Sequence, residues 1–195
     1  MPKLGMEPIR KAALVKATIS EIGRAGSLDV TVSQIAKRAG MSAALAHHYF
    51  GSKEEMFLAA MRHILTLYGA EVRGALALAE GPAGRVQAVL AASFSPANFR
   101  REAVGAWLNF WVLAQTVPEA KRLLAIYQRR LQSNLLAGLR PLAGARAGVV
   151  ADGLAALIDG LYLREVLKSG PPDGRMAVQM AQDYLRVQLA DQNGR

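Results

Sequence analysis

Three aromatic side chains lie close together in the middle of the chain. Trp107 and Trp111 are four residues apart, which places them on one face of a helix, and Phe110 lies beside them. Ring faces stabilise the diffuse charge of a quaternary ammonium without hydrogen bonds, so this cluster is a candidate cage for such a cation. The alternative is ordinary core packing, which is the commoner use of large aromatic side chains.

A carboxylate interrupts an apolar run nearer the C-terminus. Asp159 lies within residues 154–164 and precedes Tyr162 by three positions. An ionised carboxylate among apolar residues is costly unless another charge compensates it. The sequence leaves two partners open: Arg164 or another arginine, or a bound cation with Tyr162 completing its cage.

Residues 31–54 combine two helix starts with a short turn. Thr31 followed by Gln34 predicts a capping box, Gly40 predicts the end of that helix, and Ser42 can cap the next one. Two short helices joined by a glycine-containing turn are typical of a helix-turn-helix, whose second helix enters the major groove of DNA. The alternative is a helical hairpin without a nucleic-acid partner.

The sequence offers little for catalysis. It has no phosphate-binding glycine loop and no Gly-x-Ser-x-Gly elbow, and the three histidines at 47, 48 and 63 lack a zinc-binding spacing. Asp159 and Glu165 are the only carboxylates near an aromatic cluster, and no nucleophile or base accompanies them. We therefore expect neither an enzyme nor a bound metal or cofactor.

Composition indicates a helical protein with a polyanionic partner. The 195 residues are 52% hydrophobic and 20% charged, carry a net charge of +9 and include no cysteine. The absence of cysteine favours a reducing compartment, and we expect the cytoplasm. No apolar signal segment is evident near the N-terminus, and the longest uncharged apolar stretch, 103–118, is shorter than the roughly 20 residues of a membrane span.

Apolar residues recur every three or four positions between glycine and proline breaks, so the predicted class is all-α with about nine helices. Three short N-terminal helices precede a larger helical bundle, and the join lies within the fourth. The predicted ranges are 7–25, 32–39, 43–49, 53–79, 82–94, 99–115, 118–139, 146–168 and 173–190.

Residues 31–54 resemble the DNA-binding domain of the TetR family of bacterial repressors, through Thr31, Ile35-Ala36, Ala39-Gly40-Met41-Ser42, Tyr49-Phe50 and Lys53. His47 departs from the tyrosine that many members have there. The resemblance implies a DNA-binding domain at 1–55, a ligand-binding and dimerisation domain at 56–195, and double-stranded operator DNA as partner. It implies phosphate or base contacts from Thr31, Ser42, Ala43, His47, His48, Tyr49 and Lys53.

Two of these positions have a second interpretation. His48 could instead be half-buried against Phe50, which itself is expected in the core, and Tyr49 could divide its contacts between packing and phosphate.

The opening Met-Pro-Lys-Leu-Gly-Met-Glu-Pro-Ile-Arg, Ala-Trp-Leu-Asn-Phe-Trp at 106–111 and Ala-Ala-Leu-Ile-Asp-Gly-Leu at 155–161 resemble the choline-responsive branch of that family. This implies a repressor of the choline-to-glycine-betaine genes with choline or a related quaternary ammonium as effector. A repressor of other genes that responds to a different cationic or hydrophobic molecule is the alternative.

The family resemblance also implies a homodimer through the helices at 146–168 and 173–190, with Gly153 and Gly160 allowing close approach. The apolar stripes of these helices could instead be buried within the chain; their residues are Val150, Leu154, Leu157, Leu161, Met176, Met180, Tyr184 and Val187.

Overall fold

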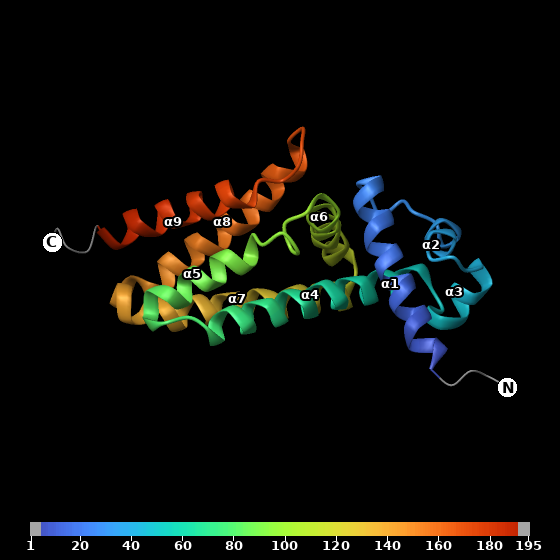
Figure 1. Ribbon diagram of the computed structural model, residues 1–195, viewed down its shortest axis with the longest axis horizontal. Coiled ribbons are helices and arrows are strands. Elements are labelled where there is room, and N and C mark those ends of the chain that lie inside the picture. The colour runs from blue at the N-terminus through green and yellow to red at the C-terminus, as the bar shows by residue number, and fades with distance from the viewer. Residues whose placement is uncertain (1–4, 191–195) are drawn as a thin grey trace. The chain divides into compact units, whose positions relative to one another are not determined.

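The computed structural model describes residues 5–190, and within them it is all helical, as predicted (Figure 1). The elements are α1 (Met6–Ala25), α2 (Val32–Arg38), α3 (Ala43–Phe50), α4 (Lys53–Ala77), α5 (Gly81–Ser93), α6 (Arg101–Thr116), α7 (Pro118–Ala143), a 3-10 turn η1 (Gly144–Arg146), α8 (Ala147–Leu167) and α9 (Gly174–Ala190).

The predicted end of α7 is wrong. Pro141 suggested that the helix stops at residue 139, but α7 continues to Ala143. A proline inside a helix removes one backbone hydrogen bond and crowds the preceding turn. Only two residues of α7 follow Pro141, so the hydrogen bond that the proline lacks affects only the last turn of the helix. Gly144, with a φ of 51°, ends it instead.

The described chain packs as two compact units. The first comprises residues 5–65 and 101–123, and the second comprises residues 66–100 and 124–190. The predicted boundary between residues 55 and 56 follows the DNA-binding motif, whereas packing divides α4 at residue 65 and places α6 with α1.

The reason for the place of α6 is a close helix crossing. A Cβ atom built on Gly105 would lie 3.3 Å from the Cα of Gly23, and one built on Gly23 would lie 2.5 Å from the Cα of Glu102. Only glycine at these two positions lets the backbones of α1 and α6 approach so closely. The first unit therefore contains α6 together with α1, α2, α3 and the start of α4.

The second unit is a helical bundle built around α7 and α8. Val86 and Leu90 of α5, Leu135 and Leu139 of α7, and Leu154 and Ile158 of α8 are fully buried in its core. α5 packs closely on α7, because a Cβ atom on Gly138 would lie 2.7 Å from the Val86 side chain.

The apolar stripe predicted for the partner-facing side of α8 is buried within the chain. Val150 and Leu154 have no exposed surface, Leu161 is 4% exposed, and Leu157 is half-buried. Gly153 faces Tyr184 of α9, while Gly160 has open space beside it. Because α8 is apolar on nearly every side, its sequence alone could not show which side faces a partner.

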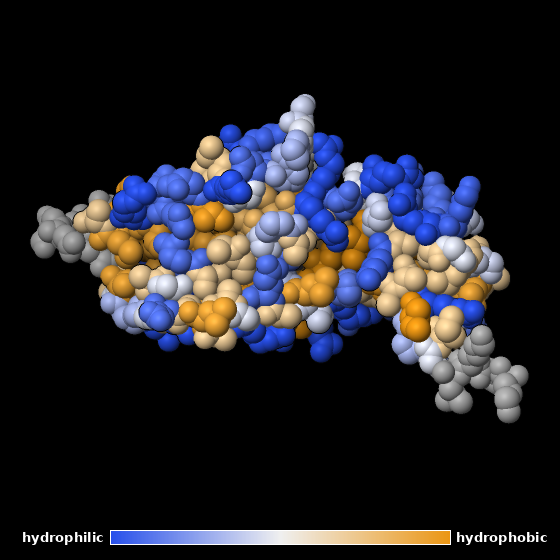
Figure 2. Space-filling model, in the orientation of Figure 1, coloured by the Kyte–Doolittle hydropathy of each residue, from blue (hydrophilic) through white to orange (hydrophobic). Residues whose placement is uncertain are grey.

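Other apolar side chains of α8 and α9 remain exposed. On α9, Met176, Met180 and Val187 of the predicted stripe are exposed by 54%, 42% and 56%. On α8 the exposed ones are Val149, Leu163 and Leu167. Figure 2 shows hydrophobic residues interspersed among hydrophilic ones over α9.

By length and composition, one stretch of the described chain could cross a membrane, residues 118–165. The stretch is not one helix, because η1 separates α7 from α8. Within this stretch, Val150, Leu154 and Ile158 of α8 are buried in the core of the second unit.

Candidate functional site

The capping box predicted at the start of α2 is present. The Thr31 hydroxyl accepts a hydrogen bond from the Gln34 backbone at 3.2 Å, and the Gln34 side chain accepts one from the Thr31 backbone at 2.7 Å. These bonds satisfy two of the backbone groups that a helix start leaves unpaired. Gly40, with a φ of 69°, then turns the chain toward α3.

The start of α3 is capped by Ser42, as predicted. Its hydroxyl accepts a hydrogen bond from the Leu45 backbone at 3.2 Å. Ala46 is fully buried and Ala43 is half-buried, so these small side chains let α3 lie close to the rest of the unit. α2 and α3 therefore form the two-helix arrangement that the motif predicted.

Both histidines of α3 are exposed. Nδ1 of His47 lies 3.1 Å from the Gly51 carbonyl oxygen, which holds the ring at the end of the helix. Because His48 is exposed, the alternative of a half-buried His48 is wrong; its ring lies 5.4 Å from that of Tyr49. Phe50, expected in the core, is half-buried.

Tyr49 and Lys53 lie at the junction of α3 and α4. Tyr49 is half-buried, and its hydroxyl accepts a hydrogen bond from Arg10 at 3.4 Å. Lys53 is the exposed first residue of α4, and its ammonium donates to the Leu28 carbonyl oxygen at 3.4 Å. The same ammonium lies 5.5 Å from the Phe57 ring centroid. A cation at a helix N-terminus suits a DNA phosphate, because the backbone N–H groups there also attract an anion.

A buried carboxylate that the sequence reasoning missed joins α1 to α2. The side chain of Glu21 is only 4% exposed and pairs with Arg24 of α1 at 2.8 Å and with Arg38, the last residue of α2. Hydrogen bonding from Arg24, with Arg38 adding to it, lowers the pKa of Glu21 in spite of burial. The three-residue spacing of Glu21 and Arg24 predicts an ion pair within one helix. No local pattern in the sequence predicts the contact of Glu21 with Arg38.

The predicted aromatic cluster forms on α6. The Trp107 and Trp111 ring centroids are 6.5 Å apart at 47° between planes. Trp107 is 3% exposed, Phe110 is fully buried and Trp111 is half-buried. The three residues belong to the first unit, whereas Asp159 and Tyr162 belong to the second, so a cage that combines all five stays a prediction.

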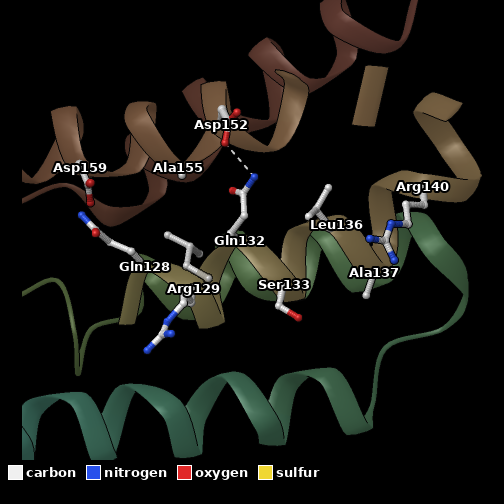
Figure 3. Close-up of a pocket in the computed structure, with 11 residues that line it drawn as sticks. Gln128, Arg129, Gln132, Ser133, Leu136, Ala137, Arg140, Asp152, Ala155 and Asp159 are labelled. Atoms are coloured by element: carbon white, nitrogen blue, oxygen red, sulfur yellow. Dashed lines mark hydrogen bonds between the residues drawn. The ribbon is translucent and has the colours of Figure 1, made fainter. Parts of the chain in front are cut away.

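Asp159 lies half-buried at the edge of a pocket between α7 and α8 (Figure 3). Among the ion pairs of the described chain none involves Asp159, and Arg164, the suggested partner, is exposed. Burial raises the pKa of Asp159 to about 6. At neutral pH the group is mostly a carboxylate that a cation in the pocket would stabilise.

Three buried tyrosines lie near enough to Asp159 for its charge to affect their pKa values. Burial raises the pKa of Tyr68 to about 12, and Asp159 adds to that rise; for Tyr127 and Tyr162 burial raises the pKa well above its usual value, again with a contribution from Asp159. The rings of Tyr68 and Tyr127 meet edge to face at 5.5 Å. Sequence reasoning missed both residues, since only folding brings α4 and α7 beside α8.

Tyr162, the predicted cage residue, is largely committed to the core. Its hydroxyl donates to the Ser93 carbonyl oxygen, and its ring packs on Phe99 with centroids 4.9 Å apart. Asp159 contributes to the raised pKa of Tyr162, so the two groups lie near each other. A ligand role for Tyr162 stays a prediction.

No group of three or more histidine, aspartate or glutamate side chains in the described part of the chain is arranged to hold a metal ion. The candidate binding sites of the described chain are therefore the helix-turn-helix surface of the first unit and the pocket beside Asp159 in the second unit.

Comparison with known families defines the class of protein. Residues 14–60 match the family described as bacterial regulatory proteins, tetR family, and residues 82–190 match the BetI-type transcriptional repressor, C-terminal. The chain belongs to the TetR family of DNA-binding transcriptional repressors and has a BetI-type C-terminal domain. Regulators of this family bind operator DNA and act as dimers.

Individual relatives narrow the class further. The HTH-type transcriptional regulator BetI of Brucella suis biovar 1 is 49% identical over 193 residues, which is 98% of each chain. A solved structure from Pseudomonas aeruginosa PAO1 has a TM-score of 0.80 at 28% identity and covers 96% of this chain and 93% of its own. One from Saccharomonospora viridis, in complex with choline, has a TM-score of 0.77 at 21% identity and covers 90% and 95%.

These findings confirm the predicted resemblance and the prediction that the protein is a regulator and not an enzyme. At 21% identity the choline complex shows a shared fold, and its ligand is a property of that relative.

Proposed function

We propose that the protein represses the genes that convert choline to glycine betaine and that choline is its effector. The relatives named BetI and the choline complex of a structural neighbour support this proposal. The observation that carries it within this chain is Asp159, a half-buried carboxylate without an ion pair at the edge of a pocket. Such a carboxylate needs a compensating cation, and the effector supplies one.

In this proposal the exposed side of the helix-turn-helix contacts the operator. Ser42, Ala43, His47 and His48 of the α3 region lie toward the bases of the major groove. Thr31, Tyr49 and Lys53 contact phosphates and set the register of the protein on DNA. The exposure of Thr31, Ser42, His47, His48 and Lys53 supports these roles.

A second copy of the chain covers the exposed apolar side chains of α8 and α9 in the proposed dimer. Isolated apolar residues are normal on a surface, but Val149, Leu163, Leu167, Met176, Met180 and Val187 come from two adjacent helices. Open space beside Gly160 adds room for close approach of a partner helix. The proposed dimer would place two recognition helices on two related half-sites about 34–36 Å apart.

The effector site of the proposal combines a charge with aromatic rings. Asp159 is the counter-ion, and Tyr162 lies beside it in the same unit. To these predicted residues the structure adds Tyr68 and Tyr127, whose phenol groups lie near Asp159. A repressor acts where the chromosome is, so we propose a cytoplasmic location.

Two measurements on the full-length protein test the proposal. Gel-shift with its own upstream DNA should show sequence-specific binding that choline weakens. Calorimetric titration with choline, betaine aldehyde and glycine betaine should show which quaternary ammonium binds. Specific DNA binding that none of the three ligands affects would contradict the proposed effector and favour a repressor that responds to a different small molecule.

A further inference from the structure

The exposed face of α3 carries two histidines beside a small side chain. Ala44, His47 and His48 are exposed and are spaced by three and four residues, so they lie on one face of the helix. Ala46 is fully buried on the opposite side. A methyl group at residue 44 leaves the His47 ring accessible from that direction, so a base edge in the major groove can reach it.

The His47 ring is held by the residue that ends α3. Its Nδ1 atom lies 3.1 Å from the Gly51 carbonyl oxygen, and the Gly51 N–H donates to the His47 carbonyl oxygen at 2.7 Å. Both contacts join the same two residues, so the ring lies against the turn at the end of the helix. A side chain that is already held in place loses less freedom when it binds a partner.

The contact with Gly51 decides which ring nitrogen of His47 carries the proton. A carbonyl oxygen can only accept, so this hydrogen bond requires a proton on Nδ1. A neutral imidazole has one N–H group, and its other nitrogen is an acceptor. The nitrogen of His47 that remains for a partner, Nε2, therefore accepts hydrogen bonds and donates none.

An acceptor selects among the groups that DNA presents. Phosphate oxygens, purine N7, guanine O6 and thymine O4 are acceptors themselves, so none of them can bond to Nε2. The donors in the major groove are the exocyclic amino groups of adenine and cytosine. His48 does not share this restriction, because no hydrogen bond among the described residues fixes its tautomer.

We propose that His47 reads an exocyclic amino group in the major groove and accepts a hydrogen bond from adenine or cytosine at Nε2. This inference rests on the proposed function, which places α3 against operator bases, and it adds the class of base that one residue selects. Every base pair has one such amino group in the major groove, on adenine or on cytosine. The selection therefore concerns the strand: adenine or cytosine, and not thymine or guanine, lies on the strand that His47 contacts.

Selection of binding sites from randomised double-stranded DNA by the full-length protein tests the proposal. The experiment is done at about pH 8, where an ordinary imidazole is neutral. Wild type should select adenine or cytosine at one position of each half-site, and His47→Ala should lose the selection at that position. His48→Ala removes the neighbouring exposed ring and is the matched control, which should keep it.

A chemical change in the selected operator isolates the hydrogen bond. Replacement of the selected base by its analogue without the exocyclic amino group should weaken wild-type binding about two- to tenfold, the range for one neutral hydrogen bond. The same replacement should leave binding by His47→Ala unchanged. Nitrogen NMR of the free protein at the same pH should show the proton of His47 on Nδ1.

Several results would overturn this inference and leave the proposed function standing. They are selection of guanine or thymine at the position that His47→Ala affects, identical selected sites for wild type and His47→Ala, equal weakening of both proteins by the analogue, and a proton on Nε2. Absence of sequence-specific DNA binding by the wild-type protein would instead overturn the proposed function.

Discussion

At the scale of single residues, Asp159 links ligand binding to protonation. Burial raises its pKa from 3.8 to about 6, which means that the folded protein holds this proton more tightly than the unfolded chain. The carboxylate therefore costs stability progressively as pH rises from about 4 to 6. A cation in the pocket would offset that cost only where Asp159 is ionised.

The first prediction is that Asp159→Asn weakens choline binding and raises the free energy of unfolding at pH 7 by about 1–3 kcal/mol. Wild-type affinity for choline should itself fall as pH drops below about 6. Calorimetry and urea denaturation measure the two effects. Asp29→Asn, an exposed control in the segment before α2, should change neither by a comparable amount. Normal choline affinity in Asp159→Asn would remove this carboxylate from the ligand site.

The second prediction concerns Lys53, the exposed first residue of α4. Lys53→Ala should weaken binding to all DNA sequences and reduce the salt slope by about 1, since it removes one phosphate contact. Fluorescence anisotropy at several salt concentrations measures the slope. Lys121→Ala, a control on α7, should leave the slope unchanged. Substitution of His47 should instead alter which operator is preferred, and an unchanged slope in Lys53→Ala would contradict the phosphate contact.

Local signals predicted some of these residues and could not predict others. Thr31, Gln34 and Ser42 act within one helical turn, so their spacing alone indicated the caps that the structure contains. Tyr68 and Tyr127 are remote from Asp159 in the sequence, and only the packing of α4, α7 and α8 brings them near it. A contact between distant segments leaves no periodic pattern to detect.

At the scale of elements, α1 has two tight connections within its unit. Gly23 makes the close crossing with α6, and Glu21 holds the end of α2 through Arg38. One side of α1 thus meets the helix that carries Trp107 and Trp111, and another meets the helix-turn-helix.

The third prediction is that Gly23→Ala destabilises the protein by about 1–3 kcal/mol, because its Cβ atom would meet the backbone of Glu102 at 2.5 Å. Gly74→Ala is the matched control, since no atom lies within 4 Å of a Cβ there. The control should gain up to about 1 kcal/mol from helix propensity. Urea denaturation compares the two variants, and equal stabilisation of both would show that the crossing is looser than described.

The fourth prediction is that Glu21→Gln lowers the free energy of unfolding at pH 7 by about 1–3 kcal/mol, the worth of hydrogen bonds to a charged group. Because the folded state lowers the pKa of Glu21, its contribution is present above the unfolded pKa of about 4.3 and is lost as pH falls through the folded value. The difference between wild type and Glu21→Gln should therefore shrink in acid.

Urea denaturation of wild type and Glu21→Gln at several pH values measures that difference. Glu119→Gln, at an exposed pair, is the control. A difference that persists undiminished below the folded pKa would show that the ion pair is not its source.

Periodicity predicted the helices well and their partners less well. Most predicted ends lie within two residues of the observed ones, because glycine, proline and capping residues mark them. The side of α8 that faces the core was not predictable, since Val149 and Val150 are equally apolar and only Val150 is buried. The place of α6 beside α1 depends on Gly23 and Gly105, two residues that lack any local signature of a contact.

At the scale of the whole molecule, ligand and operator can communicate only through the conformations that the protein adopts. The net charge of +9 favours DNA at any sequence, so control must come from specific binding and not from charge alone. α4 contributes residues to both units and connects them along the chain. Choline changes operator affinity only if it binds two conformations with different affinity.

The fifth prediction is the reciprocity that such coupling requires, and it is the most direct test of ligand control. Operator affinity of the full-length protein is measured by fluorescence anisotropy with and without saturating choline, and choline affinity is measured by calorimetry with and without saturating operator. Choline should weaken operator binding by about 5- to 150-fold, and operator should weaken choline binding by the same factor. Operator affinity that saturating choline leaves unchanged would contradict a choline-responsive repressor.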